Sequence, residues 1–364
     1  MGIYLGWDIG GVHLKLSRLI CRADGGELRT FLVPFEIWKD PGGLAARLAA
    51  LLREARGGEG AGREPAAHGV TMTAELADAF PSRRDGVRAI LAACCESLAG
   101  APIRVLDAEG ALLSVEAARE RPAAVAAANW RASAGVAARA LGGAAAVLVD
   151  VGSTTTDIIP IDDGTPCPVG RTDVERLASG ELVYSGLLRT PPASFASSVP
   201  LSGRWCRIAP EHFAVTADVY RVLGRIGAEA YTVPTPDGRG KSGEEAAARV
   251  ARLVCSEVHE LGARAVERIA AYLEDRQIDQ LARALWQVLS RLPDPAEPRA
   301  IVAGAGAFLA EAAAGRAGLR STPLQRLLPR LTGDAWAVAA PSAALALLLA
   351  EEAGESVLRP VAGA

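Results

Sequence analysis

Two short segments of the sequence combine an aspartate with a glycine turn, a pattern suited to binding phosphate. The first is Asp8-Ile9-Gly10-Gly11, and the second is Asp150-Val151-Gly152-Ser153-Thr154-Thr155-Thr156-Asp157. Glycines have no Cβ atom, so consecutive backbone N–H groups can converge on an anion while an aspartate holds a hydrated Mg²⁺ beside it. One such turn would be weak evidence, because Asp-x-Gly also forms ordinary hairpins.

Within these turns, Asp8 and Asp157 are the predicted catalytic and Mg²⁺-binding residues. A lysine near the first turn adds a positive charge, and hydroxyl groups in the second turn add hydrogen-bond donors. The predicted phosphate-binding residues of the two turns are Gly10, Gly11, Lys15, Gly152, Ser153, Thr154 and Thr155.

A third glycine segment, Gly304-Ala305-Gly306, follows an apolar run and precedes a predicted helix. At a strand-to-helix junction, glycine lets the backbone approach a nucleotide or a phosphate on the amino terminus of the helix. We therefore add Gly304 and Gly306 to the predicted phosphate-binding residues. G-x-G is common by itself, and its position after two Asp-Gly turns is the informative feature.

The elements that must position these turns alternate between strands and helices. Apolar runs over Ile3–Ile9 and Leu14–Ile20 predict a hairpin around the first turn, and 146–151 with 156–161 predict a second hairpin around the other turn. The aspartates that open the two turns lie 150 − 8 = 142 residues apart. The repeated hairpin indicates two related halves.

Other predicted strands and helices complete an α/β alternation. A third strand is expected at Phe31–Ile37, a last strand at Trp336–Ala340, and a surface loop at Gly57–Pro65. Helices are expected at 43–56, 85–99, 122–141, 242–273, 279–292 and 342–352.

A domain boundary is predicted near Gly143, where two glycines follow an alanine-rich helix. It divides the chain into residues 1–143 and 144–364, and the second part contains an irregular and helical insertion at about 165–295. Within the insertion, Gly238–Ser242 ends like a P-loop but has no strand before it, so we expect a basic loop that opens a helix. Lys241 in this loop is a candidate contact for an anionic substrate, or part of a solvated basic face.

Composition excludes several classes of protein. The 364 residues are 50% hydrophobic and 22% charged, with a formal net charge of -3, so a global positive field for nucleic acid is absent. The apolar runs are broken by charges before they reach the ~20 residues of a membrane span, and residues 1–8 do not resemble a secretory signal. We expect a cytoplasmic protein that binds neither nucleic acid nor membrane, with six reduced cysteines.

Taken in order, the two Asp-Gly turns and the late G-x-G resemble the phosphate-1, phosphate-2 and adenosine elements of the actin-like ATPase superfamily. The duplicated hairpins resemble its two ribonuclease-H-like domains. The resemblance implies an α/β fold built from a duplicated ribonuclease-H-like domain.

A closer resemblance rests on segments outside the two turns. They are V-T-M-T-A-E-L-A-D at Val70–Asp78, A-A-N-W-R-A-S at Ala127–Ser133, and G-E-L-V-Y-S-G-L-L-R-T-P at Gly180–Pro191. Together with the turns, they resemble the hydantoinase/oxoprolinase-like proteins linked to tetrahydromethanopterin C1 transfer, whose archaeal members are methanofuran-biosynthesis synthases.

This resemblance implies a transferase that joins an aminomethylfuran, activated as its methyl diphosphate, to the phenol oxygen of a (γ-glutamyl)tyramine, with release of diphosphate. A diphosphate leaving group needs the same Mg²⁺ and glycine turns as an ATP tail. Mg²⁺ is the expected cofactor; ATP binding is compatible with the resemblance, but ATP is not expected to be required.

The third of these segments supplies further candidates. Glu181 and Arg189 flank Tyr184, a predicted substrate contact, and are predicted to accept the phenol proton and to hold diphosphate. A structural ion pair is the alternative for these two charges. Asn129 and Trp130 are predicted to line the furan pocket, with helix packing as the alternative for the tryptophan.

Two other functions compete with the transferase. One is an ATP-dependent kinase or ATPase of the actin-like fold, and the other is a nucleotide-binding regulator or assembly factor without small-molecule turnover. ATP consumption separates the kinase or ATPase from the transferase, whereas the regulator would bind ATP tightly without turning over a small molecule. Small molecules are the expected partners, and a homo-oligomer is compatible with the sequence.

Overall fold

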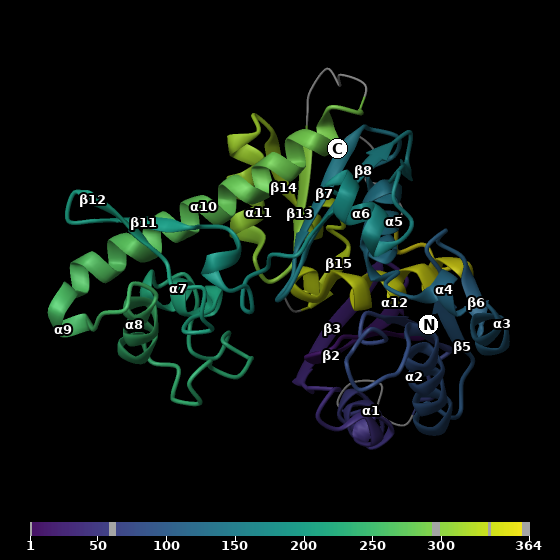
Figure 1. The fold of residues 1–364 in the computed structure, drawn as a ribbon. Helices are drawn as coiled ribbons and strands as arrows, with labels where there is room; N and C mark the ends of the chain where they lie inside the picture. The colour runs from purple at the N-terminus through teal and green to yellow at the C-terminus, as the bar shows by residue number, and fades with distance from the viewer. Residues whose placement is uncertain (1, 58–62, 293–298, 334–335, 359–364) are drawn as a thin grey trace.

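Two mixed β-sheets form the frame of the protein in the computed structural model, which describes residues 2–57, 63–292, 299–333 and 336–358 (Figure 1). The first sheet has the strand order β15-β3-β2-β1-β4-β5-β6. Its strands are β1 (Ile3–Ile9), β2 (His13–Arg22), β3 (Gly25–Pro34), β4 (Ala67–Met72), β5 (Ile103–Leu106), β6 (Leu112–Ser114) and β15 (Leu331–Gly333).

The second sheet has the order β10-β8-β7-β13-β14, with β9 also paired to β8. Its strands are β7 (Ala146–Val151), β8 (Thr156–Asp162), β9 (Thr165–Pro166), β10 (Leu182–Val183), β13 (Arg299–Ala303) and β14 (Arg320–Pro323).

The two sheets share one topology. In the first, β1 pairs antiparallel with β2 on one side and parallel with β4 on the other, and β5 extends the parallel side. In the second, β7 pairs antiparallel with β8 and parallel with β13, which β14 extends. The duplication predicted from the two turns is therefore present in the strand order, and each predicted turn lies at the same place in its half.

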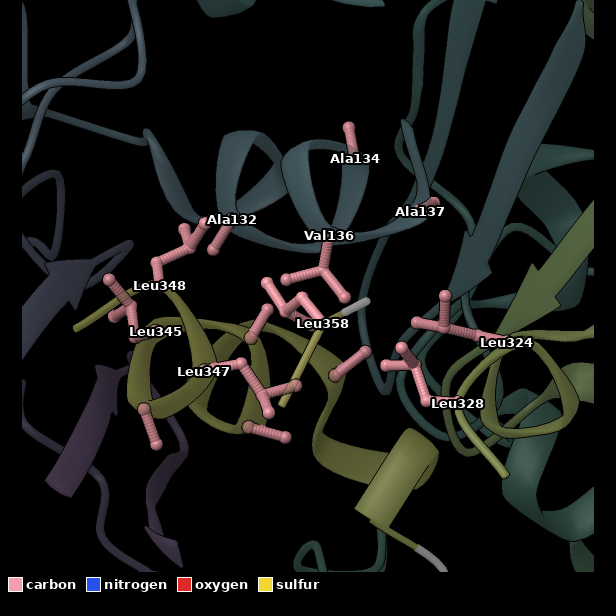
Figure 2. Close-up of a cluster of buried hydrophobic side chains, with 14 of the residues drawn as sticks. Ala132, Ala134, Val136, Ala137, Leu324, Leu328, Leu345, Leu347, Leu348 and Leu358 are labelled. Carbon is pink, nitrogen blue, oxygen red and sulfur yellow. The ribbon is translucent and has the colours of Figure 1, made fainter. Parts of the chain in front are cut away.

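Two helices, α5 (Asn129–Leu141) and α12 (Ala340–Glu352), pack against each other between the sheets. α12 lies on β1, β2 and β4, whereas α5 contacts β7, β8 and β9. Figure 2 shows Val136 of α5 in one buried cluster with Leu347 and Leu348 of α12. Residues 340–350 are all buried, as expected for a helix that is apolar on every side. This layer joins the two halves.

Shorter helices cover the outer faces. α1 (Leu44–Ala55) and α2 (Arg83–Ser97) share an apolar cluster with the first sheet, near α3 (Val115–Glu120) and α4 (Pro122–Val125). α11 (Ala307–Arg316) and part of α10 (Ala263–Leu289) pack on the second sheet. Over the described residues, none of the helices combines the length and the apolar character that crossing a membrane requires.

The insertion extends to one side of the second sheet and has its own apolar cluster (Figure 1). The long helix α10 runs from this insertion back to the sheet. The other elements are α6 (Asp173–Ser179), the hairpin of β11 (Ser198–Leu201) and β12 (Arg204–Arg207), α7 (Thr216–Val222), α8 (Gly243–Arg252) and α9 (Val258–Leu261).

Several predicted elements differ from the structure for backbone reasons. The helix expected at 122–141 is split between α4 and α5, because Ala127 adopts a φ of 49°. The helix expected at 242–273 is interrupted where Cys255 and Gly262 have positive φ. The helix expected at 279–292 is the last part of α10, which ends at Leu289.

Two predicted strands also need correction. The last expected strand is wrong, since Trp336–Ala339 forms a 3₁₀ helix instead. The third strand lies earlier than expected, because its pairing with β2 starts directly after a tight turn at residues 23–24. The loop expected at Gly57–Pro65 falls partly outside the described residues.

The C-terminal segment returns to the first sheet. β15 pairs parallel with β3, and α12 covers the same sheet on its inner face. The boundary near Gly143 stays a prediction, and residues 331–352 connect the second half back to the first.

Gly6 of β1 allows α12 to approach the first sheet. A Cβ atom there would lie 1.9 Å from the carbonyl oxygen of Ser342. We predict that Gly6→Ala lowers the free energy of unfolding by about 1–3 kcal/mol or more, because a methyl group has no room beside a helix backbone. Thermal or denaturant unfolding measures the effect.

The matched control is Gly315→Ala in α11, where a Cβ atom would meet nothing within 4 Å. We expect it to be neutral or slightly stabilising. Equal melting temperatures for Gly6→Ala and the wild type would contradict the close packing of α12.

Candidate functional site

A cleft of about 570 Å³ opens where the β1–β2 turn and the β7–β8 turn lie close together. The segment after β4, the start of α5 and the segment around β10 form the rest of its lining. Most of the residues predicted from the sequence line this cleft: Asp8, Gly10, Gly11, Lys15, Asn129, Gly152, Ser153, Thr154, Thr155, Asp157, Tyr184 and Arg189. Their roles in binding and catalysis stay predictions.

The two turns have the same backbone hydrogen bond. The N–H of Gly10 donates to the carbonyl oxygen of His13 at 3.0 Å, and the N–H of Gly152 donates to that of Thr155 at 2.9 Å. The equivalent positions of the halves thus enter one cleft from opposite sides. The second turn alone brings hydroxyl groups, from Ser153 and the threonines after it.

Each hairpin has a pair of charged residues at equivalent positions on its two strands. Asp8 is the cross-strand partner of Lys15, and Asp150 is the cross-strand partner of Asp157. The Lys15 ammonium lies 2.8 Å from a carboxylate oxygen of Asp8. Burial opposes the charge of Lys15, but the nearby Asp8, Asp150 and Asp157 outweigh that effect and raise its pKa.

Asp150 was missing from the predicted site, although its spacing from Asp8 could have identified it. Burial, followed by the charge of Asp157, raises the pKa of Asp150 to about 7. Its hydrogen bond from Ser133 is long, at 3.4 Å. Asp150 therefore binds a proton as pH falls through about 7. At the first turn, Oδ1 of Asp8 is buried and has no hydrogen-bond partner among the described residues.

Arg176 of α6 contacts both Asp157 and Trp130, and this contact indicates a role for Trp130 that differs from the predicted one. The guanidinium donates to Asp157 at 2.7 Å and lies over the Trp130 ring, 4.6 Å from its centroid. Trp130 is 2% exposed and does not line the cleft. The tryptophan therefore has the packing role, while Asn129 beside it reaches the cleft at the start of α5.

The segment 185–190 holds the second turn through its backbone. The N–H of Leu187 donates to the carbonyl oxygen of Gly152, and those of Leu188 and Arg189 donate to Ser153. At Gly186, a Cβ atom would lie 2.6 Å from the backbone of Thr154, so only glycine fits there.

Arg189 lies in the cleft as a free cation. Its guanidinium carbon is 5.4 Å from the centroid of the Trp38 ring, and no carboxylate of the described residues pairs with it. A guanidinium held over an aromatic ring and facing a cleft is suited to binding diphosphate oxygens.

Glu181 does not reach the cleft, which corrects its predicted role. Its buried carboxylate accepts hydrogen bonds from the backbone N–H groups of Val169 at 2.8 Å and Gly170 at 2.9 Å, and from Arg291 at 2.7 Å. The geometry agrees with the structural alternative, with Arg291 rather than Arg189 as the partner. A carboxylate that accepts three hydrogen bonds away from the cleft is not placed to receive a substrate proton.

Gly304 and Gly306 lie behind the second turn rather than in the cleft. The N–H of Gly306 donates to the carbonyl oxygen of Val151, and a Cβ atom at Gly304 would lie 2.5 Å from a carboxylate oxygen of Asp150. Neither glycine lines the cleft. Their small size lets β13 and α11 pack closely against the end of β7.

Lys241 also lies outside the cleft. Its ammonium is 5.3 Å from the centroid of the Tyr231 ring, within the insertion. Thr232 beside that ring does contact the site, because its hydroxyl lies 2.7 Å from Nε2 of His13. Burial, with Lys15 and Arg189 nearby, lowers the pKa of His13 to about 4, so this histidine is neutral at pH 7.

Part of the cleft lining is apolar and accessible. Leu76, Tyr184 and Val338 line it with 62%, 68% and 44% of their surfaces exposed, and Trp38 adds an aromatic ring. Exposed apolar groups beside a charged pocket are typical of a site for a ligand with an aromatic part. The sequence predicted Tyr184, but it gave no signal for the others.

Comparison of the chain with known structures identifies its fold. A structure described as "Mechanism of ATP-Dependent Acetone Carboxylation, Acetone Carboxylase nucleotide-free structure" superposes with a TM-score of 0.60 at 13% identity, covering 95% of this chain and 70% of that one. The polyphosphate/ATP-glucomannokinase of Arthrobacter sp. strain KM gives 0.45 at 15% identity, covering 97% and 100%. The acetone carboxylase match shows a shared α/β fold, and the duplication within that fold is seen in the strand order of the two sheets.

Sequence comparison gives the family. The family model described as Hydantoinase/oxoprolinase matches residues 66–351, and the chain belongs to that family. A relative from Methanocaldococcus jannaschii, named (4-{4-[2-(gamma-L-glutamylamino)ethyl]phenoxymethyl}furan-2-yl)methanamine synthase, is 35% identical over 253 residues, which are 70% of this chain and 72% of the relative. A relative of the same name from Methanococcus vannielii is 38% identical over 117 residues, 32% of this chain and 52% of that one.

Replacement of Glu181 tests its structural role. We predict that Glu181→Gln lowers the free energy of unfolding by about 1–3 kcal/mol, because an amide group faces three donors with only one accepting oxygen. Thermal unfolding measures the loss, with Glu267→Gln on an exposed position of α10 as the control. An unchanged melting temperature would show that the hydrogen bonds to Glu181 contribute nothing to stability.

The raised pKa of Asp150 predicts a stability that depends on pH. The pKa of Asp150 is about 7 in the folded state and 3.8 in the unfolded state. Ionisation of Asp150 therefore lowers the free energy of unfolding progressively as pH rises from about 4 to 7. Asp150→Asn removes this cost, and we expect its melting temperature to exceed that of the wild type by ~2 °C or more at pH 8.

The difference should shrink as pH falls toward 4 and vanish below the usual pKa of 3.8, where the carboxyl is mostly protonated in both states. Asp24→Asn, at an exposed turn, controls for the loss of a negative charge. A variant less stable than the wild type at pH 8 would mean that Asp150 is ionised and stabilising.

Proposed function

We propose that the protein forms an aryl alkyl ether in the biosynthesis of a methanofuran-type cofactor. An aminomethylfuran methyl diphosphate is the electrophile, and the phenol oxygen of a (γ-glutamyl)tyramine is the nucleophile. The observation that carries the proposal is one cleft lined both by two glycine turns suited to phosphate and by exposed aromatic and apolar side chains. The relatives named as synthases of a phenoxymethylfuran methanamine support it.

The charged side of the cleft suits the diphosphate. Lys15, Arg189 and the hydroxyl groups of the second turn provide donors that stabilise negative charge as the carbon–oxygen bond breaks. The furan shares the positive charge that develops on its CH₂ group. The exposed apolar and aromatic side chains of the lining hold the aromatic rings of the substrates.

Mg²⁺ fits this side of the cleft. The lining contains the carboxylates of Asp8, Glu75, Asp78, Asp150, Asp157 and Asp173 against the cations Lys15, Arg176 and Arg189. This acidic excess would repel a diphosphate unless a cation accompanied it. No group of three His, Cys, Asp or Glu side chains in the described ranges forms a metal site of its own.

Magnesium in proteins is often held by one or two carboxylates together with substrate phosphates. We propose Asp8, whose Oδ1 has no partner among the described residues, and Asp157 as these carboxylates. Bound Mg²⁺ would neutralise the charge of the leaving diphosphate.

The experiment follows both products without ATP. The wild-type protein is incubated with the furan methyl diphosphate, γ-glutamyltyramine and Mg²⁺, while diphosphate is assayed and the ether is detected by mass spectrometry. We expect equal amounts of ether and diphosphate, and no turnover with EDTA. ATP hydrolysis without ether formation would favour the kinase or ATPase alternative.

Asp8→Asn tests the metal and phosphate end of the cleft. We expect turnover to fall by about 10²-fold or more, since the variant loses the charge that pairs with Lys15 and meets the metal. Circular dichroism checks that the variant is folded, and Glu267→Gln is the matched control. Wild-type turnover in folded Asp8→Asn would remove Asp8 from the proposed site.

A further inference from the structure

Glu75 is a buried carboxyl group in the cleft that the roles assigned above do not use. It follows β4, lines the cleft and is 1% exposed. Its Oε2 atom has no hydrogen-bond partner among the described residues, and its other oxygen, Oε1, lies 3.9 Å from Nε of Arg83. A buried carboxyl with an unpartnered oxygen at a ligand cleft is suited to receive a proton or a polar hydrogen from the ligand.

The backbone around Glu75 is held firmly by α2. Gly86 of α2 lies against it, and a Cβ atom at Gly86 would come within 2.1 Å of the carbonyl oxygen of Glu75. The residues on either side, Ala74 and Leu76, also line the cleft. Leu76 is one of the exposed apolar side chains proposed to hold the aromatic acceptor, so Glu75 lies next in the chain to a proposed acceptor contact.

The charges around Glu75 differ from those at the turns. Arg83 of α2 and Asp173 of α6 are its charged neighbours, and they pair with each other at 3.3 Å. Lys15 is instead surrounded by Asp8, Asp150 and Asp157. Glu75 therefore lies beside the Arg83–Asp173 pair rather than in the Lys15 cluster, and Asp173 also acts on Asp157 at the second turn.

We propose that Glu75 is the general base that removes the phenol proton, an assignment that rests on the proposed function. The phenol oxygen forms a bond to the furan CH₂ carbon as the bond from that carbon to diphosphate breaks. The electron pair of the broken bond leaves with the diphosphate oxygen. The phenol proton moves to the Glu75 carboxylate, which then releases it to water.

The protonation behaviour of Glu75 agrees with this role. Burial raises its pKa to about 7, against the opposing effects of backbone N–H groups and Arg83, and Asp173 adds to the rise. The carboxylate must be ionised to accept a proton, so its contribution to the rate should increase as pH rises through about 7. A base with a pKa near the working pH is effective for a phenol of pKa ~10.

The test compares the wild type, Glu75→Gln and Glu75→Asp with γ-glutamyltyramine and with a ring-fluorinated acceptor, whose phenol is more acidic. We expect Glu75→Gln to lower kcat by about 10²-fold with the first acceptor and to leave the KM of the furan diphosphate within ~2-fold. The fluorinated acceptor should recover more activity in this variant than in the wild type. Glu75→Asp should keep the rise in rate with pH, and Glu75→Gln should lose it.

Melting curves establish that each variant is folded, and Glu267→Gln is the matched control. Any of three results for Glu75→Gln would overturn the assignment. They are a wild-type kcat, an equal fall in kcat with both acceptors, and a change confined to the KM of the furan diphosphate. In the last case, the carboxylate would bind the ammonium group of the furan instead. A wild-type protein that forms no ether overturns the proposed function first, and the base assignment with it.

Discussion

The packing of α5 against α12 is the constraint on which the cleft depends. Each helix covers one sheet, so the contact between the helices fixes the distance between two hairpin turns that belong to different halves. Gly6 lets α12 lie directly on β1, and the small Ala132 of α5 lies beside Leu348 of α12, which keeps the two helices close (Figure 2). A bulkier interface would separate the turns, and a single diphosphate could then no longer reach both.

The burial of charged side chains is the second constraint on the site. The acidic residues that line the cleft are costly to bury, and the protein compensates some of them, as with Asp8 by Lys15 and Asp157 by Arg176. In the described part of the chain, the contacts of the other two carboxyls are longer: Asp150 has a hydrogen bond of 3.4 Å from Ser133, and Glu75 lies 3.9 Å from Arg83. The pKa values of both carboxyls are raised. Buried carboxyls with raised pKa values lower the free energy of unfolding at neutral pH. Such carboxyls in a cleft are typical of functional sites.

The sequence predicted the parts of the site that local rules control. Both Asp-Gly turns, the hairpins around them and the duplicated fold followed from glycine positions and strand patterns, because these features depend on residues close together in the chain. Glu181 was placed wrongly, since its partner Arg291 is 110 residues away and no local pattern reveals such a contact. Glu75 belonged to a recognised segment, but its burial beside α2 depends on tertiary packing. The 3₁₀ helix at Trp336–Ala339 likewise shows that an apolar run does not determine the type of element by itself.

The return of the chain to its first sheet has a consequence for synthesis in the cell. β1 leaves the ribosome more than 300 residues before α12, the helix that covers it. Until that helix is made, the inner face of the first sheet, with Tyr4 and Leu19, is exposed to solvent and to other nascent chains. The N-terminal half therefore cannot reach its final packing until α12 has been synthesised. Such a protein places a particular demand on chaperones that shield early apolar surfaces.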